Sequence, residues 1–569
     1  MKIAKASSIA SIIFTFFLSA TQCTSALGAG PTVTQQNRLQ SLAEKLHERS
    51  RADRQQTAQY AARAGIPTRR ELPGGKVLEL QRIAPGLGPV FYITNNIGAA
   101  DTVSTDDVWP GGIAGLNLEG AGLIVGEWDG GAVHPGHPDI LNIIQVDGAT
   151  EISGHATHVA GTLVGSGASN PAAHGMAAAA QLNAWDWNDD TAEMATAAAG
   201  GLLVSNHSYG AATGWVYIGD SIPNEWWWIG GDGDEDPKFG YYDLEAQLWD
   251  QVAYDAPTYL AVKAAGNDRT DIGPNTGEAY TIIDDNGTPL ATSTQPRPAD
   301  CAPTGYDCLP LHSVAKNILT VGAVDDLPDG YSPLAGPGQV SMAPFSSWGP
   351  TDDGRIKPDL VANGVLLLST WIDEHSPYAV ASGTSMASPS VTGSLLLLQE
   401  HYADLHGTGN FMRSATLKAL AIHTADEAGS ADGPDYEYGW GLLNTRKAAE
   451  LISDAHVGVN HQVIEGSLQN GSTDPVPVQV PGGNSIIRAT LVWMDPPGTP
   501  APPSLDPTDP MLVNDLDLRV IDGTTLYEPW VLDPAVPAAA ATQGDNFRDN
   551  VEQVVTGTLG AGSYTVEIT

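Results

Sequence analysis

The chain has 569 residues, enough for roughly two to four domains with a large buried core. Its 26 Lys and Arg stand against 66 Asp and Glu, which gives a formal net charge of −40. A surface this acidic repels phosphate backbones, so nucleic acid is excluded as the expected partner.

The charge is unevenly distributed along the chain. By count, residues 1–83 hold 12 of the 26 basic residues and only 5 of the 66 acidic ones. The remainder therefore carries 14 basic and 61 acidic residues. We interpret most of these carboxylates as a solvated surface, although some offer the oxygen ligands that Ca²⁺ takes.

The N-terminus has the pattern of an export signal. Lys2 and Lys5 precede an apolar run at 9–18, and small residues follow. This predicts a signal peptide over residues 1–28, too short to span a bilayer, and a secreted protein. Cys23 raises a lipoprotein alternative, but the residues before it fit a lipoprotein signal poorly. No other stretch predicts a membrane span.

Residues 29–112 form a basic extension. An amphipathic pattern predicts a helix over 36–64, and short apolar runs predict strands near 76–80 and 89–93. Between residues 38 and 82 there are ten Lys and Arg against five Asp and Glu. Opposite charge would attract this unit to the acidic body that follows.

The region 113–455 alternates between buried strands and helices. This alternation predicts an α/β fold with a doubly wound, mostly parallel sheet. The expected strands lie at 123–126, 181–185, 202–206, 259–263 and 318–324.

Three residues in this region stand where strands end or helices begin. Asp129 closes a buried strand, and His155 begins a helix of small residues. Ser385 precedes the apolar run 391–398 and so stands at the start of a predicted helix. The unpaired N–H groups at a helix start favour developing negative charge. The alternative for Ser385 is an ordinary helix cap. His155 and His158 lack a metal-binding pattern, so we expect His158 to pack inside.

A nucleophilic serine needs a base, and the base needs a carboxylate that orients it. The chain order Asp, His, Ser excludes the α/β-hydrolase order. With its segments 154–161 and 383–389, the chain resembles the subtilisin-like serine proteases from about Leu116 to Ala449. Weaker matches are 205–210, 264–267 and 438–444.

The resemblance implies roles for individual residues. Ser385 would be the nucleophile, His155 the general base and acid, and Asp129 its orienting carboxylate. Asn267 matches the oxyanion asparagine. Ser208, Tyr209 and Gly210 match the segment that pairs with the substrate backbone as an added strand. The chain departs from the family pattern at two small residues, Gly130 and Ala156.

The resemblance also implies a secreted endopeptidase acting on proteins or peptides, with the basic extension as a prosegment that assists folding and inhibits. Self-cleavage would fall between Arg82 and Gly112. A permanent structural extension remains the alternative for this unit. For the whole chain the alternatives are an inactive subtilase-fold binding protein and an esterase.

Residues 456–569 change character to alternating strands separated by Pro, Gly and Asp. They predict an all-β sandwich or jelly roll, similar to the β domain of some large bacterial alkaline subtilases. The chain stops in a strand-like run at Thr569, so a product that continues beyond this residue remains an alternative.

Cys301 and Cys308 predict a loop disulfide, as expected in an oxidising compartment. The segment 211–240 is a predicted surface insertion whose Trp226–Trp228 run suggests local packing or a binding wall. Exported subtilases commonly hold structural Ca²⁺. Its candidate ligands here are Asp232, Asp234 and Asp236 in the insertion, and Asn514, Asp515 and Asp517 in the β domain.

Overall fold

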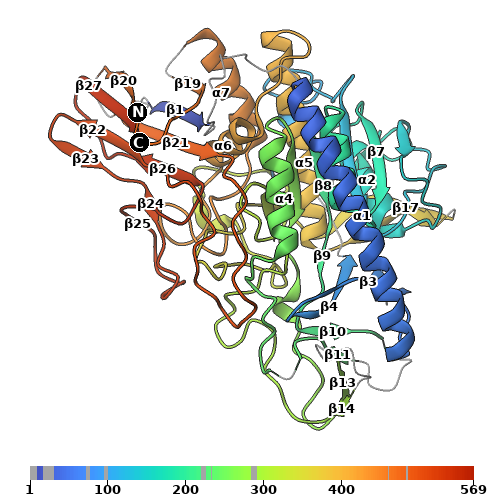
Figure 1. Ribbon diagram of the computed structural model, residues 1–569. Helices are drawn as coiled ribbons and strands as arrows, with labels where there is room; N and C mark the ends of the chain where they lie inside the picture. Colours follow the sequence, from blue (N-terminus) through green and yellow to red (C-terminus); the bar gives the residue numbers. More distant parts are fainter. Residues whose placement is uncertain are drawn as a thin grey trace.

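The computed structural model describes residues 9–16, 31–71, 77–94, 100–219, 226–231, 233–283, 291–373, 375–458, 461–481 and 485–569. It has a central α/β body, a long N-terminal helix lying across it and a β domain at one side (Figure 1). No helix in the described ranges is long and apolar enough to cross a membrane. Most of the predicted signal peptide, Cys23 included, lies outside these ranges.

The core of the α/β body is a sheet of seven parallel strands, as the alternation predicts. Across the sheet the strands are ordered β16 (Leu360–Asn363), β15 (Leu319–Val324), β12 (Leu260–Ala264), β8 (Val204–His207), β5 (Ile124–Asp129), β7 (Gln181–Asp186) and β6 (Ile143–Gln145).

Helices cover both faces of this sheet. On β12, Leu260 and Val262 join the core cluster that contains residues of α2 (Gly154–Val164) and α5 (Thr384–His406). Ala261 joins the cluster on the other face, which includes residues of α3 (Asp190–Ala199) and α4 (Leu244–Asp255). Successive strand residues face opposite sides, so the apolar strand is buried on both. Two further helices, α6 (Ser414–Thr424) and α7 (Thr445–Val457), complete the body.

Polar side chains cap the starts of α2 and α4. The Ser153 side chain accepts a hydrogen bond of 3.2 Å from the Ala156 N–H and caps α2. Asp243 caps α4 in the same way, at 3.0 Å from the Ala246 nitrogen. Such caps satisfy N–H groups that the helix leaves unpaired.

The N-terminal unit consists of α1 (Val33–Ala64), β2 (Arg69–Glu71), β3 (Val77–Ala84) and β4 (Gly88–Thr94). Its predicted helix and strands are present. The unit does not form a separate sheet: the order β2-β3-β4-β9 adds β9 (Tyr209–Ala211) of the α/β body. Figure 1 shows α1 lying beside α4 along the body.

The insertion contributes two strands, β10 (Trp215–Tyr217) and β11 (Trp226–Trp228), to a small four-stranded sheet. Two strands from later in the chain, β13 (Tyr280–Ile282) and β14 (Ala291–Ser293), complete it in the order β10-β11-β13-β14. Trp215 packs edge-on against Trp228 and Tyr280, with ring centroids 5.1 and 4.7 Å apart. These three side chains are almost fully buried. The tryptophans therefore serve local packing.

The β domain is a sandwich of two four-stranded sheets. One is ordered β19 (His461–Gly466), β1 (Ile9–Phe16), β21 (Ile486–Trp493) and β26 (Val551–Val555), and the other β20 (Asp474–Val480), β27 (Gly562–Ile568), β22 (Leu518–Asp522) and β23 (Thr525–Tyr527). Residues of both sheets share one core, including Leu491 and Val566. Two short ladders, β17 (Leu367–Asp373) with β18 (Ser376–Ala381) and β24 (Trp530–Val531) with β25 (Thr542–Gln543), complete the strands.

Candidate active site

Asp129 and His155 meet where the central strand β5 ends and α2 begins. The His155 Nδ1 atom lies 2.7 Å from each carboxylate oxygen of Asp129, and both side chains are buried. The Gly130 N–H donates to Asp129 Oδ1 at 2.7 Å. Because Nδ1 faces a carboxylate, the ring proton sits on Nδ1, which leaves Nε2 to accept a proton.

Ser385 lies in the first turn of α5, whose first residues are buried on all sides. Its hydroxyl donates a hydrogen bond of 2.6 Å to the Ser208 carbonyl. In return, the Ser208 hydroxyl donates to the Ser385 carbonyl, also at 2.6 Å. This reciprocal pair ties the start of α5 to the segment that follows β8, and the N–H groups of the first turn provide a site for negative charge.

Asn267 lies beside the same helix end. Its Oδ1 atom accepts from both the N–H and the hydroxyl of Thr384, each at 3.0 Å. These two bonds fix the orientation of the side-chain amide, so its NH₂ group is left to donate elsewhere. Thr384 was not among the predicted site residues, although its hydroxyl directly precedes the candidate nucleophile in the sequence.

Lys263 is a second residue that the sequence analysis missed. It belongs to the fully buried strand β12, and its ammonium donates to the Tyr209 carbonyl. The Nζ atom lies 3.9 Å from the centre of the Tyr209 ring. Burial lowers the pKa of Lys263 to about 7, against the attraction of Asp190 and Asp129. The sequence feature that could have identified Lys263 is the presence of a lysine within an otherwise apolar strand.

Glu127 lies two residues before Asp129 and so on the same face of β5. It is 1% exposed, and neither of its carboxyl oxygens has a hydrogen-bond partner among the described residues. Burial and the charge of Asp129 raise the pKa of Glu127 well above its usual range. Burial thus favours the neutral form of Glu127 on the same face of β5 as the Asp129–His155 pair.

His158 packs inside, as expected. Its Nε2 atom lies 3.3 Å from the Leu367 carbonyl, and the residue is fully buried. Burial, together with repulsion from His155, lowers the pKa of His158 to about 3. The ring is neutral and structural.

The edge of β9, which contains Tyr209 and Gly210, is covered by the N-terminal unit. Strand β4 pairs antiparallel with it, with Tyr92 opposite Ala211 and Thr94 opposite Tyr209. The Ala212 N–H also donates to the Phe91 carbonyl at 2.7 Å. The strand that the sequence analysis assigned to substrate thus already has a partner strand from the same chain.

Cys301 and Cys308 form a disulfide, with Cα atoms 5.2 Å apart. Among the acidic candidates for calcium, Asp236 is buried in an ion pair with Lys238 at 2.7 Å. Asp234 is 3.6 Å from Arg297, and Asp517 is 2.7 Å from Arg519.

Asp232 lies outside the described residues. Within the described ranges, Asp234, Asp236, Asp515 and Asp517 do not belong to a cluster of three or more metal-ligating side chains.

The parallel sheet with an Asp, a His and a Ser at its helix and strand ends defines a subtilisin-like protein. The model of the subtilase family of peptidases matches residues 142–441, more than half of the chain. The protein belongs to the subtilase family.

Several curated relatives match part of this chain. The serine protease/ABC transporter B family protein TagA of Dictyostelium discoideum is 24% identical over 514 residues, 74% of this chain and 27% of that protein. The serine protease AprX of Bacillus subtilis is 36% identical over 104 residues, 16% of this chain and 22% of AprX. The chain thus spans about a quarter of the length of these two relatives.

Among solved structures, the patellamide maturation protease PatA shares 20% identity and a TM-score of 0.38. The alignment covers 58% of this chain and 97% of that structure.

Proposed function

We propose that this protein is a secreted serine endopeptidase that is made as an inhibited precursor. The observation that carries the proposal is the contact of His155 with Asp129 at 2.7 Å, with Ser385 in the first turn of α5, a helix that contacts α2. Membership of the subtilase family supports the same reaction class.

In the proposed reaction, the Ser385 hydroxyl turns from the Ser208 carbonyl toward His155. Nε2 of His155 then takes the hydroxyl proton while the Ser385 oxygen attacks the peptide carbonyl carbon. Asp129 stabilises the imidazolium that forms. The protonated His155 then gives its proton to the leaving amine as the C–N bond breaks. Water, activated by the same histidine, hydrolyses the ester and regenerates Ser385.

The developing oxyanion would be bound by the NH₂ group of Asn267 and the backbone N–H of Ser385. Thr384 holds Asn267 in position through two hydrogen bonds of 3.0 Å, so the donor is fixed before the charge develops. Such preorganised donors stabilise the transition state more than the substrate.

The substrate would bind as an added strand on β9. Main-chain hydrogen bonds hold such a strand whatever its side chains, which suits an endopeptidase with many peptide substrates. Lys263 supports this strand from the interior, since its ammonium donates to the Tyr209 carbonyl. The pairing of β4 with β9 is the internal version of this binding mode.

The same pairing supports an inhibitory role for the N-terminal unit, because β4 blocks the edge that substrate needs. We propose self-cleavage after this strand, between Thr94 and Gly112. A permanent extension would keep that edge covered in the active enzyme, which conflicts with substrate binding there.

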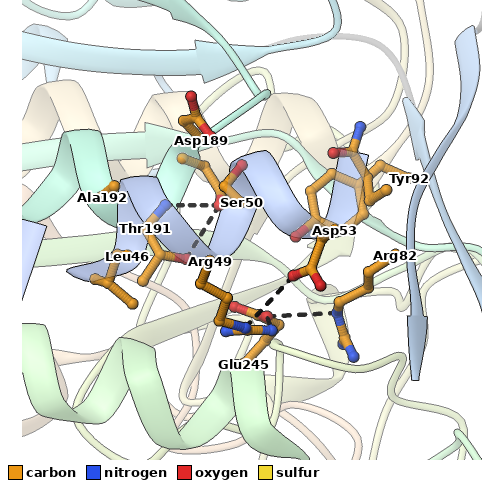
Figure 2. A pocket seen from close by; sticks show the side chains of 12 residues that line it. Leu46, Arg49, Ser50, Asp53, Arg82, Tyr92, Asp189, Thr191, Ala192 and Glu245 are labelled. Carbon is orange, nitrogen blue, oxygen red and sulfur yellow. Dashed lines mark hydrogen bonds and ion pairs between the residues drawn. The ribbon is translucent and has the colours of Figure 1, made fainter. Parts of the chain in front are cut away.

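Opposite charges hold the N-terminal unit against the body, at a pocket between α1 and the start of α4 (Figure 2). Arg49 and Arg82 both contact Glu245, the Arg82 Nε atom at 3.4 Å. Arg54 makes a bidentate pair with Asp189 at 2.7 and 2.9 Å. Figure 2 shows the two arginines Arg49 and Arg82 converging on Glu245 from separate elements of the unit.

Export is supported by the basic and apolar N-terminus and by the Cys301–Cys308 disulfide, which fits an oxidising compartment. In the structure the apolar run forms β1 between β19 and β21. If residues 1–28 are removed, the β domain must therefore remain folded without β1.

The test is covalent labelling by an organophosphonate probe, with Ser385→Ala as the matched control. The wild-type protein should be labelled, and its N-terminus after secretion should lie beyond Thr94. The Ser385→Ala protein should be unlabelled, should keep the N-terminal unit and should lose proteolysis by several orders of magnitude.

Absence of labelling in folded, processed protein would instead support the inactive binding protein. Faster turnover of short acyl esters than of casein would favour an esterase.

A further inference from the structure

Four carboxylates from four separate loops converge at the junction between the insertion, the disulfide loop and the β domain: Glu235, Asp307, Asp352 and Asp506. One oxygen each of Glu235, Asp307 and Asp506 lies within 4.8 Å of the others. The Oδ1 atoms of Asp307 and Asp352 both lie within 2.5 Å of the point where a Cβ on Gly240 would stand. Only a glycine leaves this space free.

The inner oxygens of this carboxylate cluster have no protein partner. Asp307 Oδ1 and both carboxyl oxygens of Asp352 are shielded from solvent and accept no hydrogen bond from the described residues. Arg355, the nearby cation, is already engaged with Asp353 at 2.8 and 3.0 Å. Buried carboxylates are normally paired, hydrogen-bonded or bound to a metal, so these oxygens require a partner.

The four carboxyl groups lie close enough to repel one another when they are charged. Burial, together with repulsion from neighbouring carboxylates, raises the pKa of Asp307 to about 8 and that of Asp352 to about 10. Burial raises the pKa of Glu235 and of Asp506 as well. A positive ion in the centre would remove this repulsion.

The backbone holds the inner ligands in place. The Asp307 N–H donates to the Gly349 carbonyl at 3.0 Å, next to the Cys301–Cys308 disulfide. The Asp352 N–H donates to the Gly240 carbonyl at 3.1 Å. The loops that carry Asp307 and Asp352 are thus fixed to the same framework, with their carboxylates facing each other.

We propose that Glu235, Asp307, Asp352 and Asp506 bind a calcium ion. Carboxylate oxygens are hard ligands, and the set holds neither His nor Cys, which disfavours zinc. Ca²⁺ accepts six to eight oxygen ligands in irregular geometry, whereas Mg²⁺ demands near-ideal octahedral geometry. Glu235 and Asp506 are exposed, so water can complete the coordination from that side.

The ion would join the β domain to the body. Asp506 lies in the long loop between β21 and β22, and that loop already contacts the body at other points: the Met511 N–H donates to Asp353 at 3.1 Å, and Gln247 donates to the Gly498 carbonyl at 2.6 Å. A bridge from Asp506 to Asp307 and Asp352 would fix the tip of this loop. The site takes only Glu235 from the acidic run 232–236 that the sequence suggested, and its other three ligands lie outside the suggested runs.

The test uses the full chain carrying Ser385→Ala, which prevents self-digestion and makes the result independent of the proposed activity. After chelation and removal of the chelator, calorimetric titration with CaCl₂ should give saturable binding, and CaCl₂ should raise the melting temperature more than MgCl₂ does. Asp352→Asn should weaken Ca²⁺ binding about tenfold or more, because one charged ligand is lost.

The sign of the stability change separates an ion site from a structural carboxylate. In chelator, Asp352→Asn should melt at or above the parent, because the amide cannot ionise and so adds no charge to the crowded cluster; in CaCl₂ it should melt below the parent. Asp506→Asn, at an exposed position, should repeat this pattern if Asp352→Asn folds poorly. The matched control is Asp509→Asn, an exposed aspartate in the same loop as Asp506.

Loss of stability in chelator as well as in CaCl₂, or equal Ca²⁺ responses of the Asp506 and Asp509 variants, would overturn the proposal. So would absence of Ca²⁺ binding by the parent.

Discussion

Arg82 offers the sharpest test of how the N-terminal unit is held. It is 6% exposed, and its guanidinium contacts Asp243 and Glu245 at the start of α4. Burial opposes the charge of Arg82, yet attraction to these two carboxylates holds its pKa above the ordinary value. Arg82→Gln would leave two carboxylates buried without this partner.

The free-energy cost of Arg82→Gln follows from the burial of the ion pairs that it breaks. Breaking a buried ion pair by removing one partner costs about 3–5 kcal/mol. The lower end applies here, because Arg49 still pairs with Glu245. A loss of about 3 kcal/mol corresponds to roughly a hundredfold change in an equilibrium constant. Opening of the N-terminal unit away from β9 should therefore become about a hundredfold more frequent.

The assay is amide hydrogen exchange on the full-length Ser385→Ala protein, read at the Ala212 N–H, which bonds the Phe91 carbonyl. Exchange at Ala212 reports local opening of the unit without unfolding of the body. The matched control is Arg63→Gln, an exposed arginine in the last turn of α1. Unchanged exchange in Arg82→Gln, or an equal increase in Arg63→Gln, would refute the reasoning.

Two further predictions concern the site and its pH dependence. Asn267→Ala should lower kcat by about 10²–10³ with little change in KM in steady-state assays on a peptide substrate, the size expected for loss of one oxyanion donor; a selective rise in KM would contradict this. Burial raises the pKa of Glu193 to about 9, although the Trp128 indole N–H donates to it. The folded state therefore binds the extra proton between about pH 4.5 and 9, and stability falls as pH rises through that window. Glu193→Gln on the Ser385→Ala chain should melt higher than its parent at pH 8 and equally at pH 4, by calorimetry; a lower melting temperature at pH 8 would exclude a buried, protonated Glu193.

Local sequence determined the fold class and the candidate triad. Strand and helix periodicities are short-range properties, so the alternation over 113–455 was enough to predict the parallel sheet. Parallel strands and the helices between them place their ends at one edge, which is why Asp129 and His155 could be expected to meet. The chain order of Asp129, His155 and Ser385 then separated this family from other serine hydrolases.

Only the tertiary structure decided which distant groups meet. The pairing of β4 with β9 depends on how the N-terminal unit docks, and its arginines find Asp189, Asp243 and Glu245 only in the folded chain. The net charges predicted that the unit and the body attract each other. They could not predict which residues pair, because a net charge contains no information about which side chains lie close together.

The acidic clusters show the same limit. Neighbours in an acidic run, such as Asp234 and Asp236, turn to different partners, Arg297 and Lys238. Asp307 and Asp352, far apart in sequence, face each other across Gly240. Carboxylates gather where loops are brought together by the packing of whole domains, and no local pattern in the sequence encodes that packing.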